Sequence, residues 1–154
     1  MAQITMTIRN MDKLEAAFRR APSTMAKELT EALNESRQKI ERDAKSNAPV
    51  NKSFGGGNLR QSIRSRMEAF GRAVVEAGAS YASHVEFGTK PHTIRSRGNY
   101  PLRDKRTGQV FGRVVNHPGT KAQPFMRPAV SDNENWVNDR FQGAVEKVFG
   151  HFNF

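Results

Sequence analysis

Apolar residues recur at steps of three and four positions between Pro22 and Pro49, and this period predicts the longest helix of the chain. Pro22 suits the first turn of a helix, and Pro49 disfavours helical backbone at Ala48. A single narrow apolar stripe indicates that the helix lies across a sheet, with its other side toward solvent or a neighbouring subunit. The stripe consists of Met25, Leu29, Ala32, Leu33, Ser36, Ile40 and Ala44.

Alternating apolar and polar residues predict three strands. One covers Gln3–Ile8, and two more cover Leu59–Phe70 and Arg72–Ala79, which a tight turn joins. Between the first strand and the long helix, Asp12–Arg20 has the spacing of one or two helical turns, and the glycine-rich segment 50–58 is a loop by composition. One side of the second strand holds Ile63, Ser65, Met67 and Ala69, and the other holds Arg64, Arg66 and Glu68.

The last helix is expected to begin near Pro124 or Pro128 and to end at Phe149. Ser131 and Glu134 have the spacing of a capping box, which predicts that the helix restarts after Pro128. Its expected buried stripe is Phe125, Ala129, Trp136, Val137, Phe141, Ala144, Val145 and Val148.

A segment rich in glycine, proline and arginine precedes this helix. A short helix is predicted at Ser80–Phe87, before the segment begins. Within the segment, Tyr100–Val115 has the pattern of a β-hairpin in which Gly108 takes the positive φ of the turn. The length of 154 residues suits one domain with its own core, and we expect residues 88–123 to form an extended arm of that domain.

The net charge of +10 is concentrated in the same segment. Nine basic residues between Gly88 and Arg127 accompany one acid, Asp104. This concentration predicts a polyanion or an acidic protein surface as a neighbour, unless the segment is simply a solvated basic loop. The nine basic residues are Lys90, Arg95, Arg97, Arg103, Lys105, Arg106, Arg113, Lys121 and Arg127.

Three features that are absent from the sequence exclude further classes of protein. The chain has no cysteine, which excludes disulfides, cysteine zinc sites and thiol nucleophiles and fits a reducing cytoplasm. The N-terminus has no continuous apolar region of a signal peptide, and no stretch approaches the roughly 18 apolar residues of a membrane span. We therefore expect a soluble protein without a membrane partner.

The strongest candidates for reactive chemistry are His84, Glu86 and His92, with His117 further along the chain. His84 and Glu86 are two positions apart, so a helix would point them in different directions, and no HExxH pattern is present. No nucleophile elbow and no paired carboxylates support catalysis. The glycines of Ser53–Ser62 lack the Gly-Lys-Ser/Thr ending of a phosphate loop and indicate a flexible connector. We expect no catalytic residue, metal or cofactor.

A nucleic-acid-binding protein is an open alternative. Arginine and lysine residues are interleaved with Tyr100, Phe111 and Phe125, as in proteins that bind single strands. The chain has no RNP-type aromatic motif, zinc finger or convincing helix-turn-helix. The charge therefore supports proximity to phosphates without sequence reading.

Three motifs in order carry a resemblance to a known family. They are APVNKSFGGGNLRQSI (Ala48–Ile63), YASHVEFGTKPH (Tyr81–His92) and HPGTKAQPFMRPAV (His117–Val130). Together they resemble the head–tail joining family of long-tailed bacteriophages, the HK97 gp10-like neck or tail-completion proteins, over roughly Leu29 to Val148. The chain departs from the family pattern in the first loop, where NKSFGGGN replaces the usual Thr-Gly turn, and in its long arginine-rich hairpin.

The resemblance implies an α+β fold, with a small antiparallel sheet packed by a long N-terminal helix and a C-terminal helix. It implies a non-enzymatic virion protein that is assembled in the host cytoplasm and forms a ring, expected to hold six copies, at the junction of the DNA-filled head and the tail. The implied partners are a head-closure or adaptor ring and a tail terminator or tail tube protein, with non-specific contact to genomic DNA as an open question. A tail terminator or minor tail protein of the same virion is the alternative.

Two sets of residues are expected to serve this role. Glu86 and Arg127 are polar groups between apolar neighbours, where an unpaired charge is costly, so we expect them to bridge each other or to cap nearby backbone. We favour an acidic ring over DNA as the arm's partner, since a channel that gripped every phosphate would impede DNA exit. The structural set is Tyr81, Glu86, Phe87, Gly88, Thr89, Pro124, Phe125, Arg127 and Pro128. The basic arm set is Arg95, Arg97, Arg103, Lys105, Arg106 and Arg113.

Overall fold

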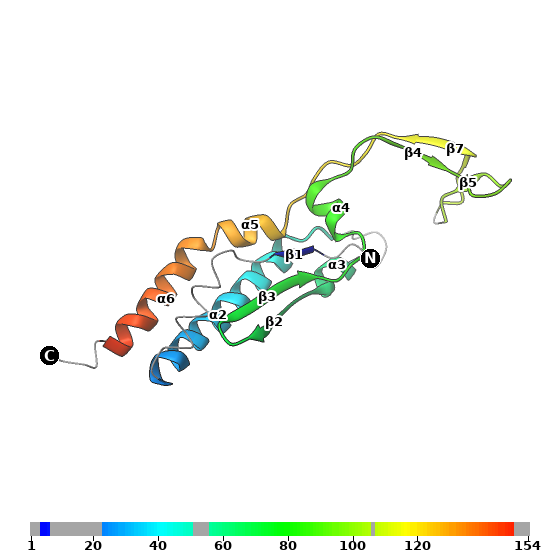
Figure 1. The fold of residues 1–154 in the computed structure, drawn as a ribbon. Helices are drawn as coiled ribbons and strands as arrows, with labels where there is room; N and C mark the ends of the chain where they lie inside the picture. Colours follow the sequence, from blue (N-terminus) through cyan, green and yellow to red (C-terminus); the bar gives the residue numbers. More distant parts are fainter. Residues whose placement is uncertain (1–3, 7–22, 51–55, 106, 150–154) are drawn as a thin grey trace.

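The computed structural model describes residues 4–6, 23–50, 56–105 and 107–149. Figure 1 shows an elongated molecule in which a body of helices and a small sheet carries a two-stranded ribbon that projects away from it. The element order confirms the predicted α+β class. The predicted helical turns at Asp12–Arg20 and the residue Arg106 lie outside the described residues.

Helix α2 (Ser23–Asn47) is the long helix that the apolar period predicts. Its stripe is buried as expected, except that Met25 at the first turn is half-buried. The exposed side carries ion pairs between residues four apart, such as Lys39 with Asp43 at 3.3 Å. The buried members of the stripe are Leu29, Ala32, Leu33, Ser36, Ile40 and Ala44.

The central sheet has three antiparallel strands in the order β1-β3-β2. They are β1 (Ile4–Met6), β2 (Ile63–Ala69) and β3 (Arg72–Ala77), so all three predicted strands are present. Helix α2 crosses one face, where the Arg37 guanidinium donates to the Ser65 hydroxyl at 2.8 Å and Ser65 donates to Glu41 at 2.5 Å. Ser65 and Met67 are half-buried on this face while Arg64, Arg66 and Glu68 are exposed, which confirms the predicted alternation as far as Met67. Ala69 was expected on the inner side and is exposed, because the register of β2 and β3 shifts between Met67 and Ala69.

The start of the second strand was predicted wrongly. Residues Asn58–Ser62 form the short helix α3, and the strand begins only at Ile63. Leu59 and Ile63 are both buried, and a helical turn places residues four apart on one side, so the helix brings both to the core. The Ser62 hydroxyl donates to the Leu59 carbonyl at 2.7 Å and completes the turn.

The C-terminal segment forms two helices, α5 (Met126–Ser131) and α6 (Glu134–Phe149). The predicted break after Pro128 is present, but the predicted capping box is wrong, because Ser131 ends α5 and its hydroxyl donates to the Pro128 carbonyl at 3.3 Å. Asn133 occupies the break instead. It is buried, and its Nδ2 donates to the Ala129 carbonyl at 2.9 Å and to Asp43 of α2 at 2.7 Å.

Helix α6 packs along α2 through a second, smaller cluster of buried residues. Arg140 and Lys147 of α6 reach across to Glu35 and Glu28 of α2, at 2.5 Å and 2.8 Å. The small cluster consists of Leu29, Ala32 and Ala144, with Met25, Phe141 and Val145 half-buried beside it.

Trp136 was expected in the buried stripe of α6 and is instead 37% exposed. Consecutive helical residues point about 100° apart, so Trp136 lies at the edge of the helix when Val137 faces the core. The Lys39 ammonium lies 5.5 Å from the centre of its ring, which places the indole beside α2 rather than beneath it.

The main core lies where α2, the sheet, α4 (Ala82–Phe87) and α5 meet. Phe125, Ile63 and Met126 are its largest fully buried side chains. The whole set is Ile40, Ala44, Ala48, Leu59, Ile63, Val75, Ala77, Ala82, Phe125, Met126 and Ala129.

Gly143 lies on the exposed side of α6, and a β-carbon added there would meet no atom within 4 Å. Glycine inside a helix costs up to about 1 kcal/mol relative to alanine, because glycine has more backbone freedom in the unfolded chain and loses it on folding. Gly143→Ala should therefore raise the free energy of unfolding by about 0.5–1 kcal/mol in urea denaturation. A lower value than that of the wild-type chain would show that this face is not open.

Asn133→Ala should destabilise the chain by about 1–2 kcal/mol at neutral pH, since its amide joins the α5–α6 break to α2. The Asn133 hydrogen bond holds the pKa of Asp43 below its usual range. Because the folded pKa is the lower one, this contribution is present above the unfolded pKa of about 4 and is lost as the pH falls through the folded value. The difference between wild type and variant should shrink as urea denaturation is repeated from about pH 6 to about pH 3. A constant difference would contradict this assignment.

Candidate functional site

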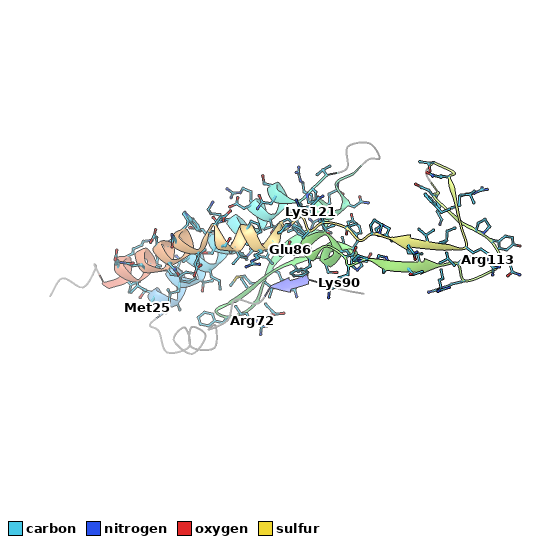
Figure 2. The ribbon with its side chains drawn as sticks, turned by 90° about the horizontal axis from the view of Figure 1, so that it is seen from above. Met25, Arg72, Glu86, Lys90, Arg113 and Lys121 are labelled. Atoms are coloured by element: carbon cyan, nitrogen blue, oxygen red, sulfur yellow. The ribbon has the colours of Figure 1, made fainter. Side chains whose placement is uncertain are left out.

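Residues 88–123, which we call the arm, form a long ribbon that leaves the body beside α4 (Figure 1). Strand β4 (His92–Arg95) pairs with β7 (Val114–His117), and further out β5 (Leu102–Arg103) pairs with β6 (Val110–Gly112). A single antiparallel bridge between Thr89 and Thr120 pairs the two chain segments of the arm where it leaves the body. Figure 2, seen from above, shows the same projection, so the arm extends beyond the packed elements in both views.

The predicted hairpin is present at the outer end of the arm. Gly108 has a φ of 74°, and its N–H donates to the Asp104 carbonyl at 2.8 Å. The sequence interpretation missed one partner, since Val114 and Val115 pair with β4 rather than continuing the hairpin. Every residue of β4 is exposed, so no buried face produces a strand pattern there.

Glu86 is the most deeply embedded charge of the site, with 2% of its surface exposed. It lies near the end of α4, and its carboxylate accepts three backbone N–H groups at the start of α5. One oxygen accepts from Phe125 at 2.8 Å and Met126 at 3.0 Å, and the other accepts from Arg127 at 2.9 Å. The first N–H groups of a helix have no partner within it, and a negative charge there is favourable. Glu86 therefore fixes the segment that enters the arm to the segment that leaves it.

Arg127 takes part in a different way from the one expected. The Glu86 carboxylate accepts the Arg127 backbone N–H, which agrees with the predicted capping of nearby backbone. The Arg127 side chain is exposed rather than embedded. Phe125 and Met126 fill the core on either side of this backbone, with no exposed surface. The successive positions of α5 point in different directions, so a buried Met126 leaves Arg127 facing outward.

The two chain segments of the arm's root, residues 85–90 and 119–127, approach each other closely. Thr89 and Thr120 exchange backbone hydrogen bonds of 3.0 Å and 3.1 Å, and their hydroxyls lie 3.0 Å apart. Gly88 and Gly119 have φ of 71° and 88°. A β-carbon on Gly88 would lie 2.5 Å from the Thr120 carbonyl oxygen, and one on Gly119 would lie 2.2 Å from that of Thr89. The root therefore requires glycine at both positions.

The three histidines within the described residues do not form a reactive cluster. His84 lies exposed on α4. His92 and His117 are opposite each other in the β4–β7 register, with ring centres 5.0 Å apart and stacked. His117 Nδ1 accepts the Gly119 N–H at 3.0 Å, so this pair supports the root. In the described ranges, no group of three or more histidine, aspartate or glutamate side chains could hold a metal ion, and no helix is long and apolar enough to cross a membrane.

The charge of the chain is divided between the arm and the body. The body, residues 23–50, 56–87 and 124–149, holds twelve basic and twelve acidic residues. The arm holds eight basic residues and one acid, Asp104. Its described members of the predicted basic set are exposed, namely Arg95, Arg97, Arg103, Lys105 and Arg113. At most one of the eight could be neutralised within the arm, so the arm presents a positive surface.

The arm also exposes large apolar side chains, which a solvated basic loop would not need. Tyr100 is 81% exposed, and Val110 is 51% exposed. An isolated two-stranded ribbon is marginally stable in water, and exposed aromatic residues beside arginine are typical of protein interfaces. The remaining apolar residues of this surface are Ile94, Phe111 and Val114.

The structural set from the sequence gathers around the root, although its members differ in burial. Tyr81 and Phe87 are 43% and 69% exposed at the two ends of α4. Pro124 lies next to the N–H groups that Glu86 accepts, and Pro128 lies in the first turn of α5. Sequence reasoning assigned no role to Gly119, Thr120 and Asn133; the HPGT sequence at the start of the third motif was the available signal for the first two.

A family model described as "Bacteriophage HK97-gp10, putative tail-component" matches residues 8–88. This match takes in more than half of the chain. It includes the first motif and the beginning of the second, and it ends at Gly88, where the arm leaves the body. The third motif lies beyond the matched residues. Neither a curated protein nor a solved structure matches the chain.

Proposed function

Because the chain belongs to the HK97-gp10-like family of bacteriophage tail components, we propose that it is a structural virion protein of the head–tail junction. In this role it forms a ring of copies around the DNA channel, expected to number six, and joins the filled head to the tail. The role is mechanical and involves no chemical step. The neighbours would be a head-closure or adaptor ring on one side and a tail terminator or tail tube protein on the other.

The observation that carries this proposal is the arm itself. Its positive charge and its exposed apolar residues suit contact with another macromolecule, and the buried Glu86 carboxylate anchors it to the body. A projecting, anchored ribbon can reach from one component of an assembly to the next. An enzyme site would instead show convergent polar groups in a cavity.

Reversing the charge at the outer end of the arm should prevent heads from joining tails. The variant is Arg103→Glu, Lys105→Glu, Arg106→Glu, which changes the arm's balance from strongly positive to near neutral. In lysates of a phage that lacks the wild-type chain, we expect free filled heads and free tails on a sedimentation gradient, with a loss of infectivity of about a hundredfold or more, as for removal of several interface charges.

The matched control reverses three exposed basic residues of the body, Lys27, Arg42 and Arg60. It makes the same change in net charge and should leave joining intact. Full infectivity of the arm variant would refute the arm's role. If the variant instead gives tails of abnormal length or with a defective tip, the alternative of a tail terminator or minor tail protein would be favoured.

A further inference from the structure

The outer face of α6 is acidic, in contrast to the arm. Asp139 and Glu146 are exposed and seven residues apart, so nearly two helical turns place them in one line along the helix. The exposed Asp132 lies seven residues before Asp139, between α5 and α6. The two basic residues of α6 do not compensate these charges, because Arg140 and Lys147 turn toward α2 and bind Glu35 and Glu28.

Trp136 lies on the same helix, with 37% of its surface exposed. The carboxylates would attract the basic residues of the arm, and the half-exposed tryptophan would provide an apolar surface for its aromatic residues. Arginine and aromatic residues are the types that contribute most to binding at protein interfaces. The arm supplies the complementary set, with Tyr100 and Phe111 among its arginines.

The arms of two copies are unsuited to each other. Each carries eight basic residues against one acid, so a contact between arms would bring like charges together at a cost. Duplex DNA would accept the positive charge, but its phosphates offer no contact for Val110, Phe111 and Tyr100. The exposed apolar residues favour a protein surface with negative charge.

The arm and α6 lie at opposite ends of the molecule in both views (Figures 1 and 2). An arm therefore projects away from the α6 of its own copy. A contact between these two surfaces joins the arm end of one copy to the α6 end of the next, so it is a heterologous interface. Heterologous interfaces close into rings when the rotation between copies allows it.

We infer that the arm of each copy docks on the outer face of α6 of the next copy. Arginines and lysines of the arm pair with Asp132, Asp139 and Glu146, and the arm's aromatic residues cover Trp136. This inference rests on the proposed ring, and it names the contact that closes it.

Sedimentation velocity of the purified full chain tests the contact through charge exchange. The first variant reverses Arg103, Lys105 and Arg106 to glutamate, and the second reverses Asp132, Asp139 and Glu146 to lysine. Each alone should weaken association by about tenfold or more, and the two together should restore it. Reversal of Lys27 and Arg42 to glutamate is the control and should leave association unchanged.

A second measurement uses the absence of cysteine in the chain. With Arg103→Cys and Asp139→Cys, a short bismaleimide should link copies into a ladder, whereas Arg103→Cys with Lys27→Cys should not. This result does not depend on whether the reversed variants fold. A ladder from the control pair alone would contradict the docking.

Three results would overturn the inference. One is unchanged association of both reversed variants, and another is a wild-type chain that stays monomeric at every concentration. The third is unaltered association together with lost binding of a fluorescent DNA duplex by the arm variant, which would assign the arm to DNA. The position of the wild-type chain in assembled virions decides the head–tail role separately, so rings that form normally with reversed arms would refute the docking alone.

Discussion

Glu86→Gln is expected to lower the free energy of unfolding by about 3 kcal/mol, which is large for one neutralised side chain. The carboxylate is buried and accepts three backbone N–H groups, and hydrogen bonds to a charged group contribute about 1.5–3 kcal/mol each. The amide of glutamine has one oxygen and turns an NH₂ group toward N–H donors. For a chain of this length the melting temperature should fall by about 6–12 °C, as measured by calorimetry.

Glu31→Gln provides the control, since Glu31 lies on α2 with its side chain exposed. A surface change of this kind should alter the free energy of unfolding by less than about 0.5 kcal/mol. Equal effects of the two substitutions would show that the Glu86 hydrogen bonds do not hold the root. Normal stability of Glu86→Gln would also remove the anchor from the proposed joining mechanism.

Gly119→Ala should open the root of the arm. The left-handed backbone costs about 1–2 kcal/mol for a residue with a side chain, and the new methyl group would lie 2.2 Å from the Thr89 carbonyl oxygen. The backbone around the position must move, so the Thr89–Thr120 bridge is expected to break. Amide hydrogen exchange at Thr89 and Thr120 should rise by about a hundredfold or more, and joining of heads to tails should fall with it.

Gly108→Ala is the control that separates the cost of left-handed backbone from the cost of the steric clash at the root. Gly108 has a φ of 74°, close to that of Gly119, but a β-carbon there would meet nothing within 4 Å. It should raise exchange only within the outer hairpin and leave the root amides protected. Protected root amides in Gly119→Ala would contradict the close approach of the two chain segments.

The body could be predicted from the sequence where a buried face imposes a period. The stripe of α2 and the alternation of β2 both follow from burial of one side, and both are confirmed except at Met25 and Ala69, at the ends of their elements. Glu86 could be found because a charge between Val85 and Phe87 needs a partner. Its partners could not be named, since they are N–H groups about forty positions away and have no side-chain signal.

The remaining errors come from contacts that have no period. β4 is exposed along its whole length, so its pairing with β7 depends on the root rather than on a hydrophobic pattern. Trp136 and Val137 both fit an apolar stripe, and only the packing of α6 on α2 decides between them. Asn133, and not the predicted cap Ser131, lies at the break between α5 and α6, because its amide donates to Asp43, ninety positions earlier. The exposed side chain of Arg127 follows from α5, whose start the sequence left open.

The position of the chain in the assembled particle tests the central claim most directly. Purified virions would be labelled with gold-conjugated antibody against the chain and viewed by electron microscopy. The account predicts label at the junction between head and tail in most particles. Label at the far end of the tail, or its absence from complete virions, would contradict the assignment to the head–tail junction.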